Sequence, residues 1–325
     1  MERMENDRLA RRRLVADMLL LLVALVWGST FVIVKQALAE IRPLAYLAVR
    51  FALACLLLLP FYGRRVVAGG RACLAQGTMI GLFLFLGYAF QTTGLQWTTA
   101  GKTGFITGMS VVIVPLLSVA LLKQTPRRDS VVGVGLAVAG LAVLTLKDSL
   151  VPGRGDLFVL ACAGCFALHI IAVGKYSGHT GADAGALATV QIGAASVFAA
   201  LASGLAEKDY WQGIGGLTGI PDAAWPAIIA TAIFATAGAF LVQNLAQRHT
   251  TPTHTALLFS MEPVFAAVFA YLLAGESLGV RGALGGLLML AGMLVAEVEP
   301  LRRSGAGGRR REPPAPIRAE RSPGA

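Results

Sequence analysis

Residues 103–122 read TGFITGMSVVIVPLLSVALL and carry no charge between Lys102 and Lys123. At a rise of about 1.5 Å per residue, a helix of this length crosses the hydrocarbon core of a bilayer, which is about 30 Å thick. Backbone groups in lipid cannot bond to water, so such a stretch has to be a helix or part of a closed barrel. The run lacks the strict alternation of a barrel strand. It therefore predicts a transmembrane helix.

The rest of the chain repeats this pattern. Of the 325 residues, 56% are hydrophobic and only 14% are charged, and the mean hydropathy is +0.68. Soluble domains carry about 25% charged residues, so this composition excludes a water-soluble fold. We predict an all-α integral membrane protein with ten transmembrane helices. Their expected ranges are 16–35, 43–62, 74–97, 100–122, 130–147, 156–175, 184–206, 223–247, 252–274 and 280–298.

The basic residues are distributed unevenly between the two sides that ten spans would create. With a cytoplasmic N-terminus, 20 of the 28 lysines and arginines fall inside, seven fall outside, and Arg50 lies within a span. The positive-inside rule then predicts a multi-pass protein of the cell membrane, inner or plasma, with both termini in the cytoplasm. The charge is divided among short loops without interleaved aromatic residues, which argues against nucleic-acid binding.

An internal repeat divides the chain. Shifting the sequence by 152 residues aligns 86–143 with 238–295 without a gap. Because an apolar composition produces chance matches, the informative ones are glycines and polar residues within spans. They are Gln91 with Gln243, Thr98-Thr99 with Thr250-Thr251, Thr103 with Thr255, Met109 with Met261, Gly133 with Gly285, and Gly140 with Gly292.

With slightly different offsets, Asp17 corresponds to Asp156 and Arg50 to Gln191. Each half then holds five helices, and an odd number inserts the second half upside down, as in many secondary transporters. The predicted regions are a basic N-terminal segment at 1–15, a first five-helix repeat at 16–147, a second at 156–298, and a disordered basic tail at 301–325.

Three motifs carry a resemblance to a known family. They are ALVWGSTF at 24–31, FITGMSVVIVP at 105–115, and THTALLFSMEPV at 253–264, the last followed by Gly275-Glu276. Together they resemble the EamA branch of the drug/metabolite transporter superfamily. The resemblance implies a ten-helix bundle around a central cavity that exports or exchanges small metabolites or drugs. The first half departs from the second by having Gln124 where the second has Glu276.

Arg50 and Glu262 are the charged residues that lie well inside predicted spans. A charge at the bilayer centre costs at least about 2.5–3.5 kcal/mol, so both are candidates for function. Glu262, expected near the midplane, could bind a cationic group or change protonation, which leaves proton coupling open. Its structural alternative is to satisfy a backbone kinked at Pro263. Arg50 could recognise a substrate carboxylate or pair with Glu262.

Further candidates for substrate binding or coupling are polar or aromatic residues within spans. A membrane tryptophan away from the interface favours a cavity position, and a lone histidine could titrate near neutral pH. Interhelical packing is the alternative for each glutamine and asparagine. These candidates are Trp27, Tyr88, Gln91, His169, Gln191, Gln243 and Asn244.

Other functions are possible in principle, and the sequence weighs against them. Gly108-Met109-Ser110 resembles the nucleophile of a serine protease, with His169 or His254 as base, but neither histidine has an evident orienting partner. A channel or structural membrane component is the second alternative, although the chain lacks charged rings. No ATP-binding loop is present, and no metal or cofactor is expected. We therefore predict a secondary transporter that is not an enzyme; a homodimer remains open.

Overall fold

The computed structural model describes residues 2–122, 128–145, 152–179, 183–275 and 279–305. Every regular element within these ranges is a helix. The first half contains α1 (Glu2–Ala37), α2 (Pro43–Leu95), α3 (Ala100–Thr107), α4 (Ser110–Leu122) and α5 (Arg128–Thr145). The second contains α6 (Arg154–His179), α7 (Ala184–Ala206), α8 (Lys208–Gly213), α9 (Trp225–Ala232), a π-helical turn η3 (Ile233–Gly238), α10 (Ala239–Ala246), α11 (Pro252–Phe259), α12 (Glu262–Ala274) and α13 (Gly279–Gly305).

Seven helical stretches of the described chain are long and apolar enough to cross a membrane, and two shorter apolar ones lie at 131–143 and 279–292. One of the seven is α2, whose 53 residues cover two of the predicted spans. The all-helical, multi-pass membrane class predicted from composition is confirmed.

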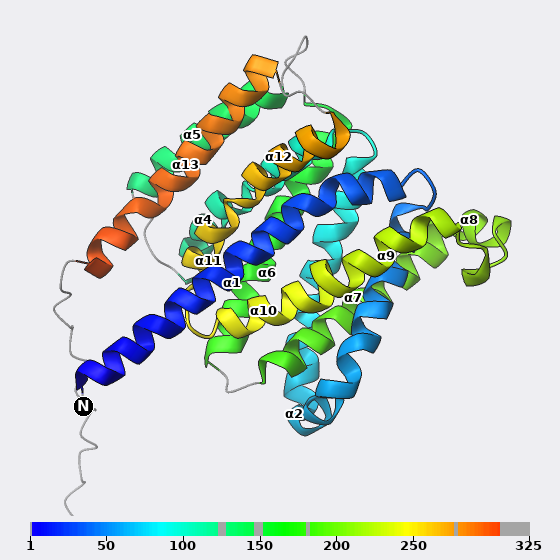
Figure 1. The fold of residues 1–325 in the computed structure, drawn as a ribbon, viewed down its shortest axis with the longest axis horizontal. Coiled ribbons are helices and arrows are strands. Elements are labelled where there is room, and N and C mark those ends of the chain that lie inside the picture. The colour runs from blue at the N-terminus through cyan, green and yellow to red at the C-terminus, as the bar shows by residue number, and fades with distance from the viewer. Residues whose placement is uncertain (1, 123–127, 146–151, 180–182, 276–278, 306–325) are drawn as a thin grey trace, which may run out of the picture.

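The predicted connection between residues 62 and 74 is helical except at Gly70. Gly70 has φ +56° and ψ −151°, which a residue with a side chain rarely adopts. At this point α2 folds back, so its two limbs form a helical hairpin (Figure 1). The limbs correspond to the predicted helices 43–62 and 74–97.

Two predicted helices, 100–122 and 252–274, are interrupted in the structure. The first breaks at Gly108-Met109, between α3 and α4, and the second at Ser260-Met261, between α11 and α12. In the second, Pro263 has no N–H to donate to the carbonyl of Phe259, which accounts for the break. The two breaks stand 152 residues apart, at equivalent positions of the repeat.

The predicted helix 223–247 contains a π-helical turn, η3. Within it, Thr236 Oγ1 donates a 2.9 Å hydrogen bond to the carbonyl oxygen of Thr231, five residues earlier. π-Helical turns inside α-helices occur frequently at functional sites.

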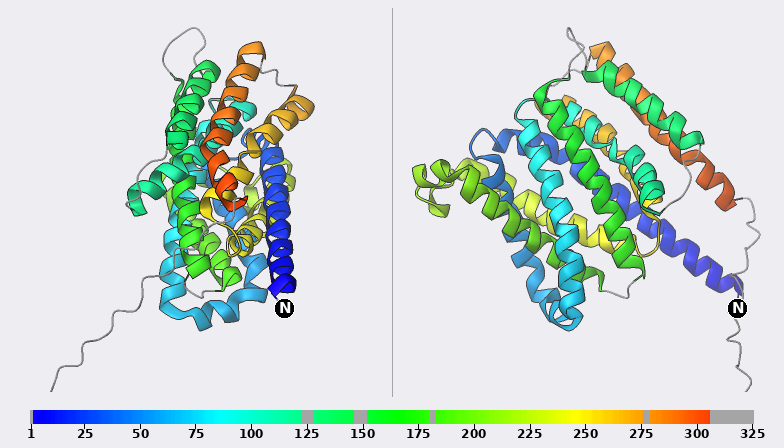
Figure 2. Two further views of the ribbon diagram at one scale, coloured as in Figure 1. Left: turned by 90° about the vertical axis from the view of Figure 1, so that its left-hand side faces the viewer. Right: turned by 180° about the vertical axis from the view of Figure 1, so that it is seen from behind.

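α5 and α13 pack against each other along one edge of the molecule (Figures 1 and 2). A Cβ added at Gly140 would lie 2.6 Å from the carbonyl oxygen of Gly285, and one added at Gly292 would lie 2.5 Å from that of Gly133. Because Gly133 aligns with Gly285 and Gly140 with Gly292, the two contacts are reciprocal. Glycine at these positions allows the two backbones to approach closely.

The structure extends helix beyond the expected bounds at both ends of the chain. α1 begins at Glu2, so most of segment 1–15 is helical, and α13 continues to Gly305, into the expected disordered tail. Residues 306–325 of that tail lie outside the described residues. Segment 207–222 holds α8 and two short 3₁₀ turns, at Leu217–Gly219 and at Asp222–Ala224, the second running on past the segment. Glu207 anchors it by accepting bonds of 3.0 and 2.8 Å from the backbone N–H groups of Leu44 and Ala45.

Candidate functional site

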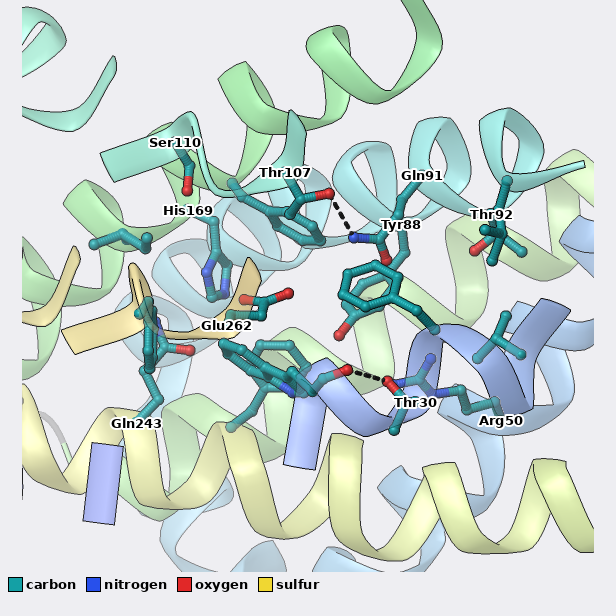
Figure 3. A pocket seen from close by; sticks show the side chains of 18 residues that line it. Thr30, Arg50, Tyr88, Gln91, Thr92, Thr107, Ser110, His169, Gln243 and Glu262 are labelled. Carbon is teal, nitrogen blue, oxygen red and sulfur yellow. Dashed lines mark hydrogen bonds between the residues drawn. The ribbon is translucent and has the colours of Figure 1, made fainter. Parts of the chain in front are cut away.

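A cavity lies inside the bundle, between α1, α2, α6, α10 and the two broken helices (Figure 3). About 670 Å³ within it is free of protein atoms, but the centre of a water-sized molecule can move in only about 40 Å³. The space is therefore a narrow cleft, and a larger solute requires side chains to move. Its lining residues are Trp27, Thr30, Phe31, Val34, Arg50, Tyr88, Gln91, Thr92, Leu95, Thr107, Ser110, Phe166, His169, Ile170, Phe240, Gln243, Phe259 and Glu262.

Arg50 reaches the cavity from the first limb of α2 and is 1% exposed. Its Nε donates a 2.7 Å bond to Thr236 Oγ1, and one terminal nitrogen donates to the carbonyl oxygen of Ala235 at 3.3 Å. The guanidinium carbon also lies 4.8 Å from the centre of the Tyr88 ring, within the range of a cation–π interaction. The π-helical turn thus holds the arginine, because it supplies a hydroxyl and a carbonyl group as acceptors.

Glu262 is the first residue of α12 and is 8% exposed. Among the described residues, its carboxyl group has no hydrogen-bond partner and no ion pair with Arg50. The alternative that Arg50 pairs with Glu262 is therefore absent from this structure, and Tyr88 lies between the two side chains (Figure 3). Burying a carboxylate without a partner costs free energy, and binding of a proton or a cation would offset that cost.

Aromatic rings form much of the cavity wall around Glu262. Trp27 lies 4.9 Å from Phe259 and 5.3 Å from Phe240, measured between ring centroids, and Tyr88 lies 5.1 Å from Phe166. The indole Nε1 of Trp27 donates a 2.9 Å bond to the carbonyl oxygen of Ala235. Trp27 thus lines the cavity, as its mid-helix position predicted, and shares with Arg50 an acceptor in the π-helical turn.

The predicted glutamines and the histidine differ in their partners. Gln91 Nε2 donates to Thr107 Oγ1 at 3.1 Å, beside the first helix break. His169 Nε2 forms a 3.0 Å bond with Gln191 Oε1, and Gln243 Nε2 donates to Gln247 Oε1 at 3.0 Å. Within the part of the chain that the structure describes, the buried Nε2 of Gln191 and Oε1 of Gln243 have no hydrogen-bond partner.

Seven of the nine predicted site residues therefore line one cavity, and two do not. Gln191 bonds to His169, which lines the cavity, but is not itself a lining residue. Asn244 accepts a bond from Ser177 at 3.1 Å and donates to the carbonyl oxygen of Phe240 at 2.8 Å. The bond to Ser177 joins α10 to α6, which agrees with interhelical packing, the alternative to substrate binding for Asn244.

Ser110 lines the cavity, but it is not among the residues predicted to bind substrate or to couple transport. It begins α4 as Glu262 begins α12, and both line the cavity. The repeat alignment, which pairs Ser110 with Glu262, was the available signal. His169 bonds to Gln191 rather than to Ser110, and the described residues contain no Ser–His hydrogen bond of the kind a serine protease needs. The side chain of His254 lies outside the described residues.

A polar network joins α1, α3, α6 and the turn between α2 and α3, next to the cavity residues Val34 and Leu95. Asp156 Oδ1 accepts a 3.1 Å bond from Thr98 Oγ1, and Asp156 Oδ2 lies 3.5 Å from Lys102 Nζ. Lys35 Nζ donates to the carbonyl oxygen of Thr98 at 2.9 Å. This network ties four chain segments together at one end of the cavity.

These apolar helices surround a buried cavity in which one carboxyl group has no partner among the described residues, an arrangement that belongs to multi-pass membrane proteins with an internal site. Comparison with known proteins narrows this class: a model of the EamA-like transporter family matches residues 14–146 and again residues 153–297. The chain belongs to this family, as its motifs suggested. The two matches fall on the two halves of the chain.

Curated relatives agree with this membership. The chain is 34% identical over 287 residues to an "Uncharacterized transporter" of Archaeoglobus fulgidus, covering 88% of this chain and 87% of the relative. It is 24% identical over 280 residues to "Uncharacterized transporter YyaM" of Bacillus subtilis, covering 83% and 89%. A crystal structure is similar in fold, with a TM-score of 0.62 and 18% identity, over 89% of this chain and 98% of its own. The protein is a membrane transporter homologue.

Proposed function

We propose that the protein is a secondary transporter that exports or exchanges a small metabolite or drug-like molecule by alternating access. The observation that carries this proposal is the narrow buried cavity in which Arg50 and Glu262 are both present and unpaired with each other. A solute with polar groups can satisfy them inside the membrane. Neither group is matched by the same residue in the other half, since Arg50 aligns with Gln191 and Glu262 with Ser110.

The proposed architecture is ten spans in two inverted five-helix repeats. Three observations support it: helix breaks 152 residues apart, the reciprocal glycine contacts of α5 with α13, and the two consecutive family matches. Two similar halves of opposite orientation can exchange conformations, which gives inward-open and outward-open states of comparable energy. The cavity would open to one side at a time.

Glu262 is the residue we assign to coupling or to binding of a cationic group. Its carboxyl has no partner among the described residues, so both a proton and a substrate ammonium group would be favoured there. Arg50 is assigned to an anionic substrate group, such as a carboxylate, because its guanidinium group lines the cavity and pairs with no carboxylate among the described residues.

We place the protein in the cell membrane with both termini in the cytoplasm, on the basis of the 20-to-7 distribution of basic residues. Reporter fusions after Pro300 and within 207–222 test this orientation. The tail fusion should report from the cytoplasm and the loop fusion from outside. A tail that reports from outside contradicts an even number of spans with a cytoplasmic N-terminus.

The transport proposal is tested in two stages. A metabolite export and uptake screen that compares cells with and without the protein identifies the substrate. Purified protein in vesicles then separates a carrier from a channel, because substrate loaded inside should accelerate entry of labelled substrate from outside. Uptake that is indifferent to internal substrate, and that does not saturate, would indicate a channel and contradict alternating access.

A further inference from the structure

A second hollow lies on the outside of the bundle, between α1, α2, the π-helical turn η3 and α10. It leaves about 590 Å³ in which the centre of a water-sized molecule can move, far more than the internal cavity. Tyr62 is the single lining residue whose side chain carries a polar atom. Several lining residues are strongly exposed, among them Phe61 at 71%, Phe234 at 65% and Leu22 at 54%. We call this hollow the lateral groove.

The lateral groove lies on three membrane-spanning stretches, so its surroundings are lipid rather than water. Its lining offers dispersion contacts to a hydrocarbon chain and, apart from Tyr62, no polar side chain that would hold a polar molecule. An acyl chain is the occupant that this chemistry fits.

One end of the lateral groove is basic. On α2, Leu57, Phe61 and Arg64 follow one another at spacings of four and three residues, which places them on one face of the helix. Arg64 is exposed and has no partner among the described residues, whereas Arg65 pairs with Asp183 at 3.1 Å and lies over the Tyr62 ring. A free arginine thus continues the stripe of groove-lining residues.

The other two groove-lining helices carry basic residues at the same end. α1 has Arg11-Arg12-Arg13 in sequence before its groove residues, and the exposed Arg248 follows α10. Since α1 runs opposite to the first limb of α2 and to α10, these residues belong to one end of the bundle, where the N-terminus lies (Figure 1). Clusters of arginine beside membrane helices attract anionic lipid headgroups.

We propose that the lateral groove is a binding site for an anionic phospholipid, with one acyl chain along α1, α2 and η3 and the headgroup at Arg64. The site touches the internal cavity through the π-helical turn. Phe234 and Ala237 of that turn line the groove, while Ala235 and Thr236 accept the hydrogen bonds of Trp27 and Arg50. A bound acyl chain packs against the outer face of the turn that positions both cavity residues.

Native mass spectrometry of the purified full chain tests the proposal, with phosphatidylglycerol and phosphatidylcholine of identical acyl chains as probes. The parent protein should retain one phosphatidylglycerol per chain in preference to phosphatidylcholine. Leu22→Trp should remove both adducts by filling the groove. Leu25→Trp is the matched control, because Leu25 lies on the same helix, is 36% exposed and does not line the groove. Leu57→Trp fills the groove from α2, and it replaces Leu22→Trp in this experiment if that variant fails to fold.

Arg64→Gln tests the headgroup. It should lower the phosphatidylglycerol adduct about fivefold, to the level of phosphatidylcholine, because one basic residue near the surface contributes about 1 kcal/mol. Arg71→Gln, which removes an exposed basic residue away from the groove, should leave the preference unchanged. Lipid adducts that survive both tryptophan variants overturn the site. A dimer that forms in the parent and is lost in Leu22→Trp would assign the groove to a second copy of the chain instead.

Discussion

The two broken helices, α3–α4 and α11–α12, have equivalent backbones and different chemistry. Each breaks two residues before a side chain that enters the cavity, and that side chain is Ser110 in the first half and Glu262 in the second. A broken helix exposes backbone groups and is tolerated in a membrane where it lines a cavity. The repeat therefore supplies the same backbone feature twice, and the difference between Ser110 and Glu262 places a carboxyl group at only one of the two breaks.

The sharpest test of this comparison is to remove each side chain. Glu262→Gln should preserve the fold and substrate binding while abolishing the response of transport to a proton gradient, because glutamine imitates the protonated carboxyl but cannot release a proton. Ser110→Ala should change the rate by less than about tenfold, the effect of one neutral hydrogen bond. Reconstituted vesicles with an imposed pH difference provide the measurement.

Two other outcomes of that experiment are informative. A Glu262→Gln protein still driven by the pH difference would remove Glu262 as the coupling site. Loss of all activity with retained folding would move it to substrate binding, and exchange in the parent that is independent of pH would make proton coupling untenable.

A second test concerns the other unmatched charge, Arg50, whose counterpart by alignment is Gln191. Arg50→Gln should weaken binding of an anionic substrate by about 1.5–3 kcal/mol, the range for hydrogen bonds to charged groups, and weaken a neutral analogue less. Binding to purified protein is measured for both ligands, after the fold is checked by thermal unfolding. Equal losses for the two ligands would assign Arg50 to holding the π-helical turn.

The third test compares the two halves where both have glycine, at Gly140 on α5 and Gly292 on α13, and asks whether the two contacts stabilise the protein equally. Gly140→Val and Gly292→Val should each destabilise the protein by about 1–3 kcal/mol, since both added side chains meet backbone atoms of the facing helix. Gly135→Ala is the control, because a Cβ at Gly135 on α5 meets nothing within 4 Å. Thermal unfolding in detergent gives the comparison, and strongly unequal losses would argue against a symmetric α5–α13 pair.

The smallest expected difference is between the repeat-related glutamines. Gln91→Leu removes the hydrogen bond to Thr107 and should lower the free energy of unfolding by about 1 kcal/mol. Gln243→Leu should lower the free energy of unfolding by less, because it also removes the buried Gln243 Oε1, which has no partner among the described residues. Thermal unfolding of the two variants side by side measures the difference. A larger loss for Gln243→Leu would indicate that its free oxygen is bonded in solution.

The sequence by itself determined the class, most of the helical stretches and seven residues that line one cavity. Long uncharged runs leave the backbone no alternative to helix in lipid, and a charged residue within a span has to face the protein interior, which is why Arg50 and Glu262 were found. The motifs indicated the family that the comparison confirmed. Ten spans and inverted halves stay predictions.

Only the tertiary structure decided which polar residues share the cavity. Gln191 and Asn244 are buried polar residues in spans, like Gln91 and Gln243, and composition cannot tell a cavity position from interhelical packing. The π-helical turn also depends on it, because Trp27 and Arg50 both donate to the carbonyl oxygen of Ala235, which is more than 180 positions away from each of them. These contacts between distant segments favour the π-helical conformation, and local sequence preference does not encode such contacts.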